Sequence, residues 1–446
     1  MLIAFNEPEI SFGRGQERST IDPVQGLITY HPLDYNNTTR TIKNEIKLAI
    51  IGKREDRDAI MIKIGQLNQT HKATRIYREY PGFENVYCIK ISVDADLCQY
   101  FDSGDVDNII TSPEPLNGIV DLYSTKIDLL DEKRIPYTLL LLCLPQEFES
   151  FFFAENQDLR AMLKAKCIGK NKYSQFLTYL YATPPDMCDF LWNLSLGIYV
   201  SGGGVPWELT RHYSGISFIG ITFGIKRGRD RQDILVGIAE IFNEYGESVS
   251  IRAINDSFTS DKGLHLSRDK MRSLMTNIIK DYIERTGMSP TNLVIHKTSD
   301  YLNDEIEGIL DCIDETTKVD LIYLKANTTL QLYPEKGEQK AGFPPCRGTF
   351  WKITDRTGLL YTTGYIDRFG TFPGQGTPRP KEIIKSYGEA NIENIAEQIL
   401  ALTKMNWNTA RYMVSEPVTM EYARKIISIT KVGDLDPTIR DFRFYF

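Results

Sequence analysis

The residues from Ile216 onward constrain the fold most, because they form successive strands with short connections. The run Ile216–Phe223 (ISFIGITF) is apolar and lies between Gly215 and a basic turn. Ile234–Phe242 and Ser248–Ile254 repeat the pattern at the spacing of hairpins. We therefore predict an antiparallel meander of three strands, which belongs to an α/β layer.

Helices and strands alternate after this meander. The predicted elements are helices at 269–286 and 303–312, strands at 292–296 and 320–325, and two late helices at 392–402 and 419–428. A meander followed by alternating helix and strand matches an RNase H-like α/β layer.

The first strand of the meander carries no acid. Nucleases built on such a meander usually hold Mg²⁺ with an aspartate inside this strand, and here Thr222 occupies the position. A hydroxyl group cannot replace an ionised carboxylate as a ligand for a hard cation. The sequence therefore predicts a nucleic-acid fold that has lost its chemistry.

The residues before the meander form a separate α/β region. The predicted elements are strands at 87–93 and 137–144 and helices around 159–165 and 176–181. This alternation predicts a Rossmann-like domain with a site at the strand ends. The glycine run in Ser201–Trp207 is the clearest break in the chain, so we place the boundary between domains 1–202 and 203–446.

Composition constrains the setting of the chain rather than its chemistry. Its 446 residues suffice for two or three domains. The net charge of −7 neither indicates nor excludes nucleic-acid binding, because local patches act over about 8 Å. Seven scattered cysteines are typical of reduced thiols in the cytosol. The sequence shows no signal peptide and no apolar run of about 20 residues, so we expect a cytoplasmic protein without a membrane span.

Basic residues cluster between Leu159 and Pro185 without an acidic residue among them. Arg160 and Lys164 share one face of the predicted helix, and a following turn could return Gln175 to the same point. Arginine, lysine and an amide that converge near a helix end make a phosphate clamp. A solvated basic face is the alternative interpretation. The basic residues of the segment are Arg160, Lys164, Lys166, Lys170 and Lys172.

Several short motifs, in the same order and spacing, resemble one known family. They are Leu191–Trp207, Leu360–Gly364, Gly376–Lys381, Leu402–Thr409 and Met420–Lys425, with Pro8–Gln16 at the start. The first of these resembles the junction of the MID and PIWI domains of Argonautes, and the later ones resemble the end of the PIWI domain. Pro8–Gln16 is similar to the opening of short prokaryotic Argonautes.

The resemblance implies a Rossmann-like MID domain followed by an RNase H-like PIWI domain. It further implies that the N-terminal and PAZ domains of longer relatives are absent, because 446 residues leave no room for them. The MID domain of the family holds the 5′-phosphate of a guide strand. On this chain that role falls to Arg160, Lys164 and Gln175.

Two further features of the phosphate pocket follow from the resemblance. Ser201 stands where the family has its last lysine, and Lys170 or Lys172 would compensate for the missing charge. In prokaryotic members the C-terminal carboxylate, here on Phe446, shares a divalent cation with the phosphate. Phe446 and Gln175 are therefore expected to hold a structural Mg²⁺.

The resemblance also locates the positions of the catalytic acids. An active PIWI domain uses three acids and a fourth Asp or His. The first falls at Thr222, the third at Thr298 and the fourth at Arg424, and the mobile glutamate belongs to the region Asp256–Asp261. Two hydroxyl groups and a cation cannot hold two Mg²⁺ ions. We therefore expect a chain that is not an enzyme and leaves any enzymatic activity to a partner.

Four basic residues are expected near the nucleic-acid backbone. Lys226 and Arg227 follow the first strand of the meander, where a guide runs in the family, although a basic hairpin tip is the alternative. Arg379 and Lys381 lie in a motif that matches the family, which favours a contact with guide or target.

The implied function is that of a guide-binding sensor. The resemblance implies a small RNA guide, a complementary single-stranded DNA target from a plasmid or phage, and an effector partner with an APAZ domain. That partner is usually a TIR or sirtuin-like NAD hydrolase and less often a nuclease. The pair would form a heterodimer that can assemble further on activation, and NAD depletion would then end the infection by killing the cell.

Other functions are kept as alternatives. One is a metal-dependent nuclease that uses displaced acids such as Asp256, Asp261 or Asp300. In such an enzyme His296 could act as a base, although a histidine at the end of an apolar strand is more typical of a core. His212 either touches nucleic acid or packs at the domain junction. A structural partner that binds no guide is the last alternative.

Overall fold

The computed structural model describes most of the chain. The described residues are 1–13, 18–35, 40–42, 44–73, 78–152, 158–178, 180, 184, 186–211, 213, 215–227, 232–241, 249–256, 259–260, 263–325, 328–333, 344–374, 376–433 and 441–445. Between 226 and 263, and at 285, the description covers at most the backbone.

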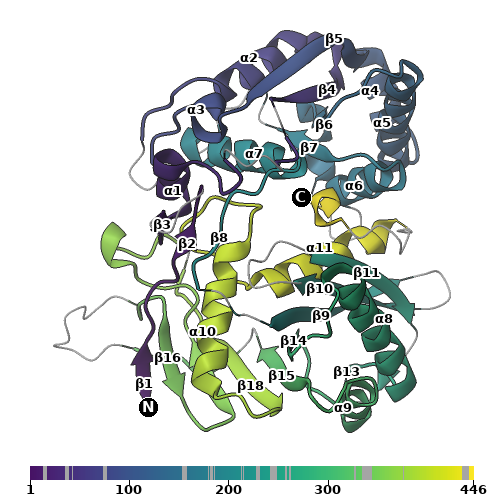
Figure 1. The fold of residues 1–446 in the computed structure, drawn as a ribbon. Coiled ribbons are helices and arrows are strands. Elements are labelled where there is room, and N and C mark those ends of the chain that lie inside the picture. Colours follow the sequence, from purple (N-terminus) through teal and green to yellow (C-terminus); the bar gives the residue numbers. More distant parts are fainter. Residues whose placement is uncertain are drawn as a thin grey trace. The chain divides into compact units, whose positions relative to one another are not determined.

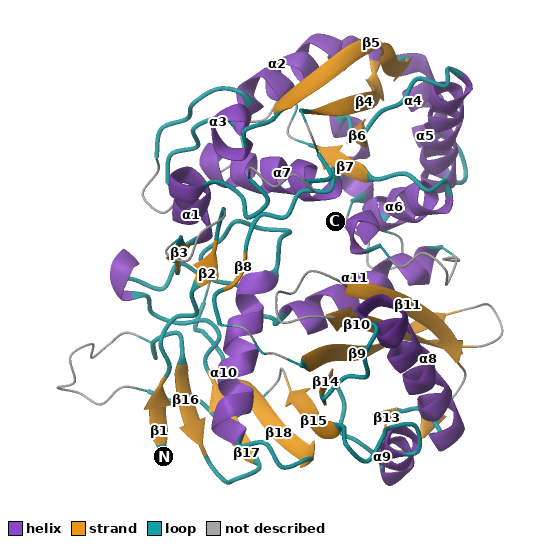
Figure 2. Ribbon diagram, in the orientation of Figure 1, coloured by secondary structure: helices purple, strands orange, loops and turns teal. Residues whose placement is uncertain are grey.

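The chain divides into two compact units (Figures 1 and 2). The four-stranded unit comprises Ser11–Trp207, Trp407–Arg411 and Ser428–Phe446, and the nine-stranded unit comprises Met1–Ile10, Glu208–Asn406 and Tyr412–Ile427. This division differs from the expected one between residues 202 and 203. The first segment joins the later unit, and two C-terminal segments join the earlier one, because contacts remote in sequence decide the grouping.

The four-stranded unit is built on a parallel sheet with the strand order β5-β4-β6-β7. Its strands are β4 (Glu45–Lys53), β5 (Lys90–Phe101), β6 (Leu139–Cys143) and β7 (Ser174–Leu177). All of β6, with the sequence LLLLC, is buried. A continuous apolar run of this kind is typical of a parallel strand that is covered on both faces.

Helices cover this sheet and complete a Rossmann-like layer. They are α1 (Pro23–Tyr30), α2 (Arg57–Leu67), α3 (Phe83–Tyr87), α4 (Ser103–Ile110), α5 (Pro115–Glu132), α6 (Leu159–Gly169) and α7 (Met187–Ser201), with short pieces β3 (Ser19–Thr20), η1 (Arg54–Asp56), η2 (Gln146–Phe151) and η5 (Phe442–Tyr445). Tyr123 of α5 and Leu163 of α6 pack with Leu140 and Leu142 of β6 in one core. Asp158 caps α6 by accepting from the amide of Arg160 at 2.9 Å.

Two expectations for this unit need correction. The helix expected at 176–181 is wrong, because Phe176 and Leu177 belong to β7 and pair with Leu142 and Cys143 of β6. The strand expected at 87–93 begins only at residue 90, since α3 ends at Tyr87. In both places a contact outside the local sequence decides the structure.

The nine-stranded unit holds a mixed sheet with the order β1-β16-β17-β18-β15-β14-β9-β10-β11. The strands are β1 (Leu2–Ala4), β9 (Ile216–Arg227), β10 (Gln232–Ile241), β11 (Val249–Asp256), β14 (Asn292–Lys297), β15 (Lys318–Lys325), β16 (Thr349–Lys352), β17 (Thr357–Leu360) and β18 (Lys381–Tyr387). β14 pairs in parallel with both β9 and β15, and the other neighbours are antiparallel. The expected meander is therefore present as β9, β10 and β11.

Helices pack on both faces of this sheet. They are α8 (Arg268–Thr286), α9 (Asn303–Leu310), α10 (Ile392–Leu402) and α11 (Val418–Val432), and the short pieces are β2 (Ile10–Ser11), β8 (Glu208–Leu209), β12 (Thr259–Ser260), β13 (Gly263–Leu264), η3 (Asp367–Phe369) and η4 (Thr403–Met405). α8 buries Met271, Leu274 and Ile278, one helical turn apart, against Ile219 of β9. α10 lies against β16, β17 and β18 (Figure 1). Within the described residues, no helix has both the length and the apolar character needed to cross a bilayer.

A glycine in β9 allows α11 to approach the sheet. A Cβ atom at Gly220 would lie 2.2 Å from the carbonyl oxygen of Thr419, which is far inside contact distance. The start of α11 therefore packs directly on the backbone of β9. Any larger residue at this position would push the helix away.

A buried charge cluster ties the first segment to the nine-stranded unit. Glu7 Oε1 lies 2.9 Å from Arg347 Nε and 2.6 Å from Lys404 Nζ, and the two cationic side chains are 2% exposed. Burial alone would raise the pKa of Glu7, but Arg347 and Lys404 outweigh it and lower that pKa. Arg347 Nη2 also donates to Thr403 Oγ1 at 2.7 Å.

We predict that Glu7→Gln strongly destabilises the chain. The change leaves two buried cations without their carboxylate, which typically costs about 3–5 kcal/mol. The midpoint of urea unfolding should fall accordingly, while Arg54→Gln at the exposed pair with Asp102 should leave that midpoint nearly unchanged. Because the folded pKa of Glu7 lies below its unfolded value, this stabilisation is present above the unfolded pKa. It is lost as the pH falls through the folded pKa. Equal midpoints for both variants would contradict the prediction.

Candidate functional site

The first residues of β7 gather three of the expected phosphate ligands. Lys164 of α6 is 3% exposed, and its Nζ donates to the Ser174 carbonyl at 2.6 Å and to Ser174 Oγ at 3.2 Å. Gln175 Nε2 donates to Ser201 Oγ at 2.8 Å and to the Gly197 carbonyl at 3.3 Å. Lys164, Gln175 and Ser201 thus come from α6, β7 and the end of α7 to one place.

Arg160 lies on the same face of α6 as Lys164. Its guanidinium carbon lies 5.6 Å from the ring centroid of Phe152 and 5.8 Å from that of Phe176. Lys164 Nζ lies 5.8 Å from the Phe176 ring as well. Both cations therefore meet one aromatic ring of β7, as their spacing of four residues predicts.

The expectation that Lys170 or Lys172 supplies the missing cation is wrong. Lys170 pairs with Asp128 of α5. Lys172 Nζ lies 2.6 Å from Asp131 Oδ1 of the same helix and 5.1 Å from the ring centroid of Tyr137. Both lysines are turned toward acids of α5, which the local sequence does not reveal.

Tyr173, Asp441 and Arg443 form a cluster that sequence reasoning missed. The single arginine in the aromatic C-terminal tail is the one sign of it in the sequence. Arg443 Nε lies 2.9 Å from both carboxylate oxygens of Asp441, and its Nη2 donates to Tyr173 Oη at 2.9 Å. Tyr173 Oη also donates to Asp441 Oδ2 at 2.8 Å. Burial, together with the bond to Asp441, raises the pKa of Tyr173 to about 12. Tyr173 precedes Ser174 and Gln175, so this cluster borders the expected pocket.

The described part of the expected Mg²⁺ site does not suffice for the ion. Phe446 lies outside the described residues. Gln175 donates its amide hydrogens to Ser201 and Gly197, so the side chain offers a cation one neutral oxygen as a ligand. The carboxylate of Asp441 is bound by Arg443 and Tyr173. Hard dications favour several oxygen ligands with carboxylates among them.

The nine-stranded unit brings two positions of the expected catalytic set together. Thr222 of β9 and Thr298, which follows β14, lie side by side because these strands pair in parallel. Their Oγ1 atoms are 3.2 Å apart, and the amide of Thr298 donates to the Ile221 carbonyl at 3.3 Å. Thr222 is buried, with 4% exposure. Two hydroxyl groups bonded to each other thus occupy the place that the resemblance gives to two acids.

Arg424 of α11 and Lys381 of β18 bind one carboxylate. Arg424 Nη1 lies 3.1 Å from Glu416 Oε1, and the Lys381 ammonium binds the same oxygen. Burial raises the pKa of Glu416, but these two cations outweigh it and lower that pKa. Lys381 is 6% exposed, so the expectation that it presents a cation to a nucleic-acid backbone is wrong.

The structure says less about the other residues that were expected to contact the nucleic-acid backbone. Arg379 is exposed. Lys226 and Arg227 end β9, and their side chains lie outside the described residues. His212, Asp261 and the side chain of Asp256 lie outside them too.

Comparison with known proteins assigns a family to this chain. The family described as the Piwi domain matches residues 154–432, which is more than half of the chain. The chain belongs to the Piwi domain family. The expected fold class, a Rossmann-like MID domain followed by an RNase H-like PIWI domain, is confirmed.

Two relatives point to an Argonaute-type protein. The protein argonaute of Aquifex aeolicus (strain VF5) is 22% identical over 247 residues, which are 54% of this chain and 32% of that protein. The structure of Clostridium butyricum Argonaute bound to a guide DNA (5′ deoxycytidine) and a 19-mer target DNA is similar with a TM-score of 0.74 and 19% identity. That likeness covers 100% of this chain and 55% of the other. The chain therefore spans about a third of the first relative and about half of the second.

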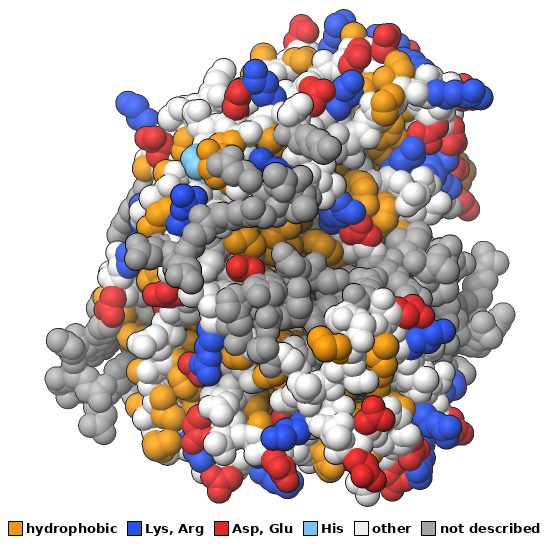
Figure 3. Space-filling model, in the orientation of Figure 1, with side chains coloured by type: hydrophobic (Ala, Val, Ile, Leu, Met, Phe, Trp, Pro, Cys, Tyr) orange, Lys and Arg blue, Asp and Glu red, His pale blue; other side chains and the backbone are white. Residues whose placement is uncertain are grey.

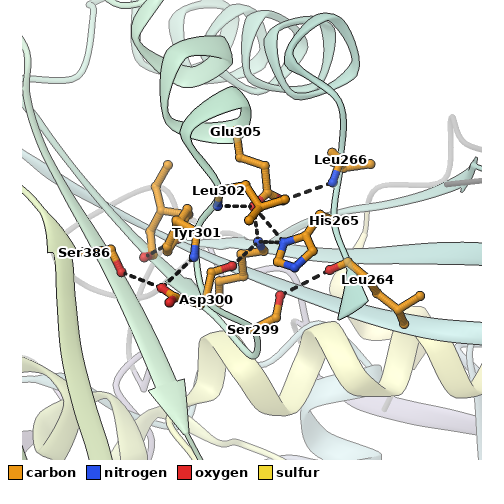
Figure 4. A network of polar contacts seen from close by, with 11 residues as sticks. Leu264, His265, Leu266, Ser299, Asp300, Tyr301, Leu302, Glu305 and Ser386 are labelled. Carbon is orange, nitrogen blue, oxygen red and sulfur yellow. Dashed lines mark hydrogen bonds and ion pairs between the residues drawn. The ribbon is translucent and has the colours of Figure 1, made fainter. Parts of the chain in front are cut away.

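A buried polar network holds the turn that follows β14 of the Piwi domain (Figure 4). Glu305 Oε2 lies 2.5 Å from Lys297 Nζ and 3.1 Å from His265 Nδ1, and the amide of Leu302 donates to it at 3.1 Å. Burial lowers the pKa of Lys297, and the charge of Glu305 opposes this shift. Lys297 directly precedes Thr298, so the network fixes the position of that threonine. The sequence pattern gives no sign of it.

Asp300 belongs to the same turn. Its Oδ1 accepts from the amide of Tyr301 at 2.8 Å and from Ser386 Oγ at 3.3 Å. These contacts make the carboxylate a cap of the turn, which is a structural role.

His296 of the Piwi domain is a core histidine. It is 0% exposed, and its Nδ1 lies 3.0 Å from Thr419 Oγ1. Its Nε2 is buried and has no hydrogen-bond partner among the described residues. Burial lowers the pKa of His296 to about 3, so the ring is neutral near pH 7. The structure therefore favours the interpretation as a core histidine over that as a catalytic base.

We predict that His296 does not titrate between pH 5 and 8. NMR of ¹³C,¹⁵N-labelled imidazoles should show constant shifts for the ring whose signals are absent from the His296→Gln spectrum. Because the folded pKa lies below the unfolded value of 6.5, stability should fall as the pH drops from 6.5 toward 3. A signal that titrates near neutrality and vanishes in His296→Gln would refute this assignment.

Proposed function

We propose that the chain binds a guide strand by its 5′-phosphate and a complementary strand by base pairing. The observation that carries the proposal is the convergence of Lys164, Gln175 and Ser201 at the start of β7. The Lys164 ammonium supplies positive charge for a phosphate, and on binding the Gln175 amide would exchange its bond to Ser201 for one to a phosphate oxygen. The solved structure of Clostridium butyricum Argonaute, bound to guide and target DNA, supports the same use of this fold.

The guide is proposed to be a small RNA and the target complementary single-stranded DNA from a plasmid or phage. Base pairing supplies the sequence readout, while the phosphate anchors the guide. On the face drawn in Figure 3, Lys and Arg side chains are interspersed with Asp and Glu. Backbone contacts therefore depend on local cations such as Arg379, and affinity falls with salt. Mg²⁺ at the guide phosphate remains a prediction.

The chain is proposed to recognise its target without cutting it. Thr222 and Thr298 offer hydroxyl groups where two Mg²⁺ ions would need carboxylates. Arg424 brings a further positive charge to the fourth position, which disfavours a dication. The second candidate, a nuclease that uses Asp300, is disfavoured because that carboxylate caps a turn.

The response is proposed to come from a partner. A short Argonaute of this kind would act in the cytoplasm as a heterodimer with an APAZ-domain effector, either a TIR or a sirtuin-like NAD hydrolase. Formation of the guide–target duplex would favour one arrangement of the complex and so switch the effector on. NAD depletion would follow, with death of the invaded cell. A nuclease effector is the alternative.

We predict that the purified chain, loaded with guide, leaves a complementary strand intact in Mg²⁺ or Mn²⁺. Gel analysis of an end-labelled target over a long incubation measures this directly. Should cleavage occur, comparison with Asp300→Asn separates the chain's own acids from a contaminating nuclease. Cleavage that this variant loses would overturn the proposed inactivity.

We also predict that Lys164→Met removes most of the preference for a phosphorylated guide. A hydrogen bond to a charged group contributes roughly 1.5–3 kcal/mol, which is about tenfold or more in affinity. Fluorescence anisotropy with 5′-phosphorylated and 5′-hydroxyl versions of one RNA gives the ratio. Lys172→Met is the matched control, since that lysine pairs with Asp131 outside the site.

The co-purifying nucleic acid tests the same proposal without any variant. Short RNAs recovered from the chain, expressed with its genomic neighbour, should accept a 5′ label only after phosphatase treatment. A chain that carries no nucleic acid and shows no preference between the two RNAs would leave the structural-partner alternative.

A further inference from the structure

The tail of the chain is packed into the four-stranded unit. η5 packs against α6 and α7. Phe444 is buried and stacks on Tyr173, with ring centroids 4.3 Å apart. Phe442 packs on Trp407 with a centroid distance of 5.8 Å. The residue between these two aromatic anchors, Arg443, is therefore held in a defined place.

Arg443 reaches the end of α7. One of its terminal nitrogens, Nη1, lies 2.8 Å from the point where a Cβ atom on Gly203 would stand. Gly203 has a φ of +105°, which only glycine adopts without strain, and it follows Ser201 by two residues. The backbone thus leaves room for a guanidinium beside Ser201.

Two of the three guanidinium nitrogens of Arg443 are held by neighbouring side chains, and the third is not held by a described residue. Nε and Nη2 bind Asp441 and Tyr173, whereas Nη1 makes no hydrogen bond to a described residue. The Arg443 side chain is 25% exposed, so a ligand can reach it. The carbonyl end of α7 also favours a cation at this place.

One chain of contacts joins Arg443 to the phosphate ligands. Arg443 binds Tyr173, and the next residue, Ser174, accepts from Lys164. Gln175 follows and donates to Ser201. Lys164 and Arg443 therefore bind two neighbouring residues at the start of β7, Ser174 and Tyr173, and Gln175 is the next residue of the strand.

We propose that Arg443 is the second cation for the terminal phosphate and takes the role that Ser201 cannot fill. This assignment rests on the proposed binding of a 5′-phosphorylated guide. Nη1 presents its two N–H groups to the phosphate, while Asp441 and Tyr173 hold the fork in position. A guanidinium suits this role because its planar donors match phosphate oxygens. The ligand class is a strand that ends in a phosphate monoester.

The test compares Arg443→Gln with Arg411→Gln in the full chain at one Mg²⁺ concentration. Arg411 forms a similar fork with Asp189 in the same unit, at 3.1 and 2.7 Å. The probes are one 3′-labelled RNA with a 5′-phosphate or a 5′-hydroxyl group. Arg443→Gln should weaken binding of the phosphorylated RNA about tenfold and leave the hydroxyl form unchanged. Arg411→Gln should change neither, and Arg443→Lys should recover part of the loss.

Each other outcome counts against the assignment. Full phosphate preference in Arg443→Gln would overturn it while the proposed function stands. An equal loss for both RNAs would show that Arg443 only holds the tail in place. A wild-type chain that binds both RNAs equally would remove the proposed function, and the assignment with it.

Discussion

The parallel pairing of β9 with β14 determines where the polar residues of the Piwi domain lie. Both strands are apolar, and their register sets Ile219 opposite Ile295 in the core. Just beyond this register come Thr222 and Thr298, whose hydroxyl groups meet at 3.2 Å. A slip of one residue would turn every side chain of β14 to the other face. Burial of the strands, rather than the bond between the hydroxyl groups, therefore fixes the pair.

Around these strands, carboxylates are neutralised by cations of the chain itself. Glu305 is bound by Lys297, and Glu416 is bound by Lys381 and Arg424. A dication needs carboxylates whose charge is not already compensated. These ion pairs support the proposed absence of a two-metal centre, because the carboxylates of Glu305 and Glu416 are already bound by cations of the chain.

Local patterns predict the elements of this chain better than the partners of its charges. The strand at 216–223 and the helix at 392–402 follow from apolar period, and both are present. The helix expected at 176–181 fails because Phe176 and Leu177 pair with β6. Charge partners are set by tertiary contacts: Lys170 and Lys172 meet acids of α5, about forty residues earlier. The contact between Arg443 and Tyr173, which are 270 residues apart, is equally invisible in the sequence.

The two units use their cations in opposite ways, and this difference bears on guide selection. In the nine-stranded unit, Arg424 and Lys381 both direct donors to one acid, Glu416, in a cluster with one net positive charge. At the start of β7, Lys164 donates to the neutral oxygens of Ser174, and Nη1 of Arg443 makes no hydrogen bond to a described residue. A phosphate monoester carries between one and two negative charges near pH 7, so one buried ammonium compensates it only in part. The preference for a 5′-phosphate over a 5′-hydroxyl group therefore depends on how many cations contact the phosphate. Base pairing selects the sequence of the guide's partner strand separately.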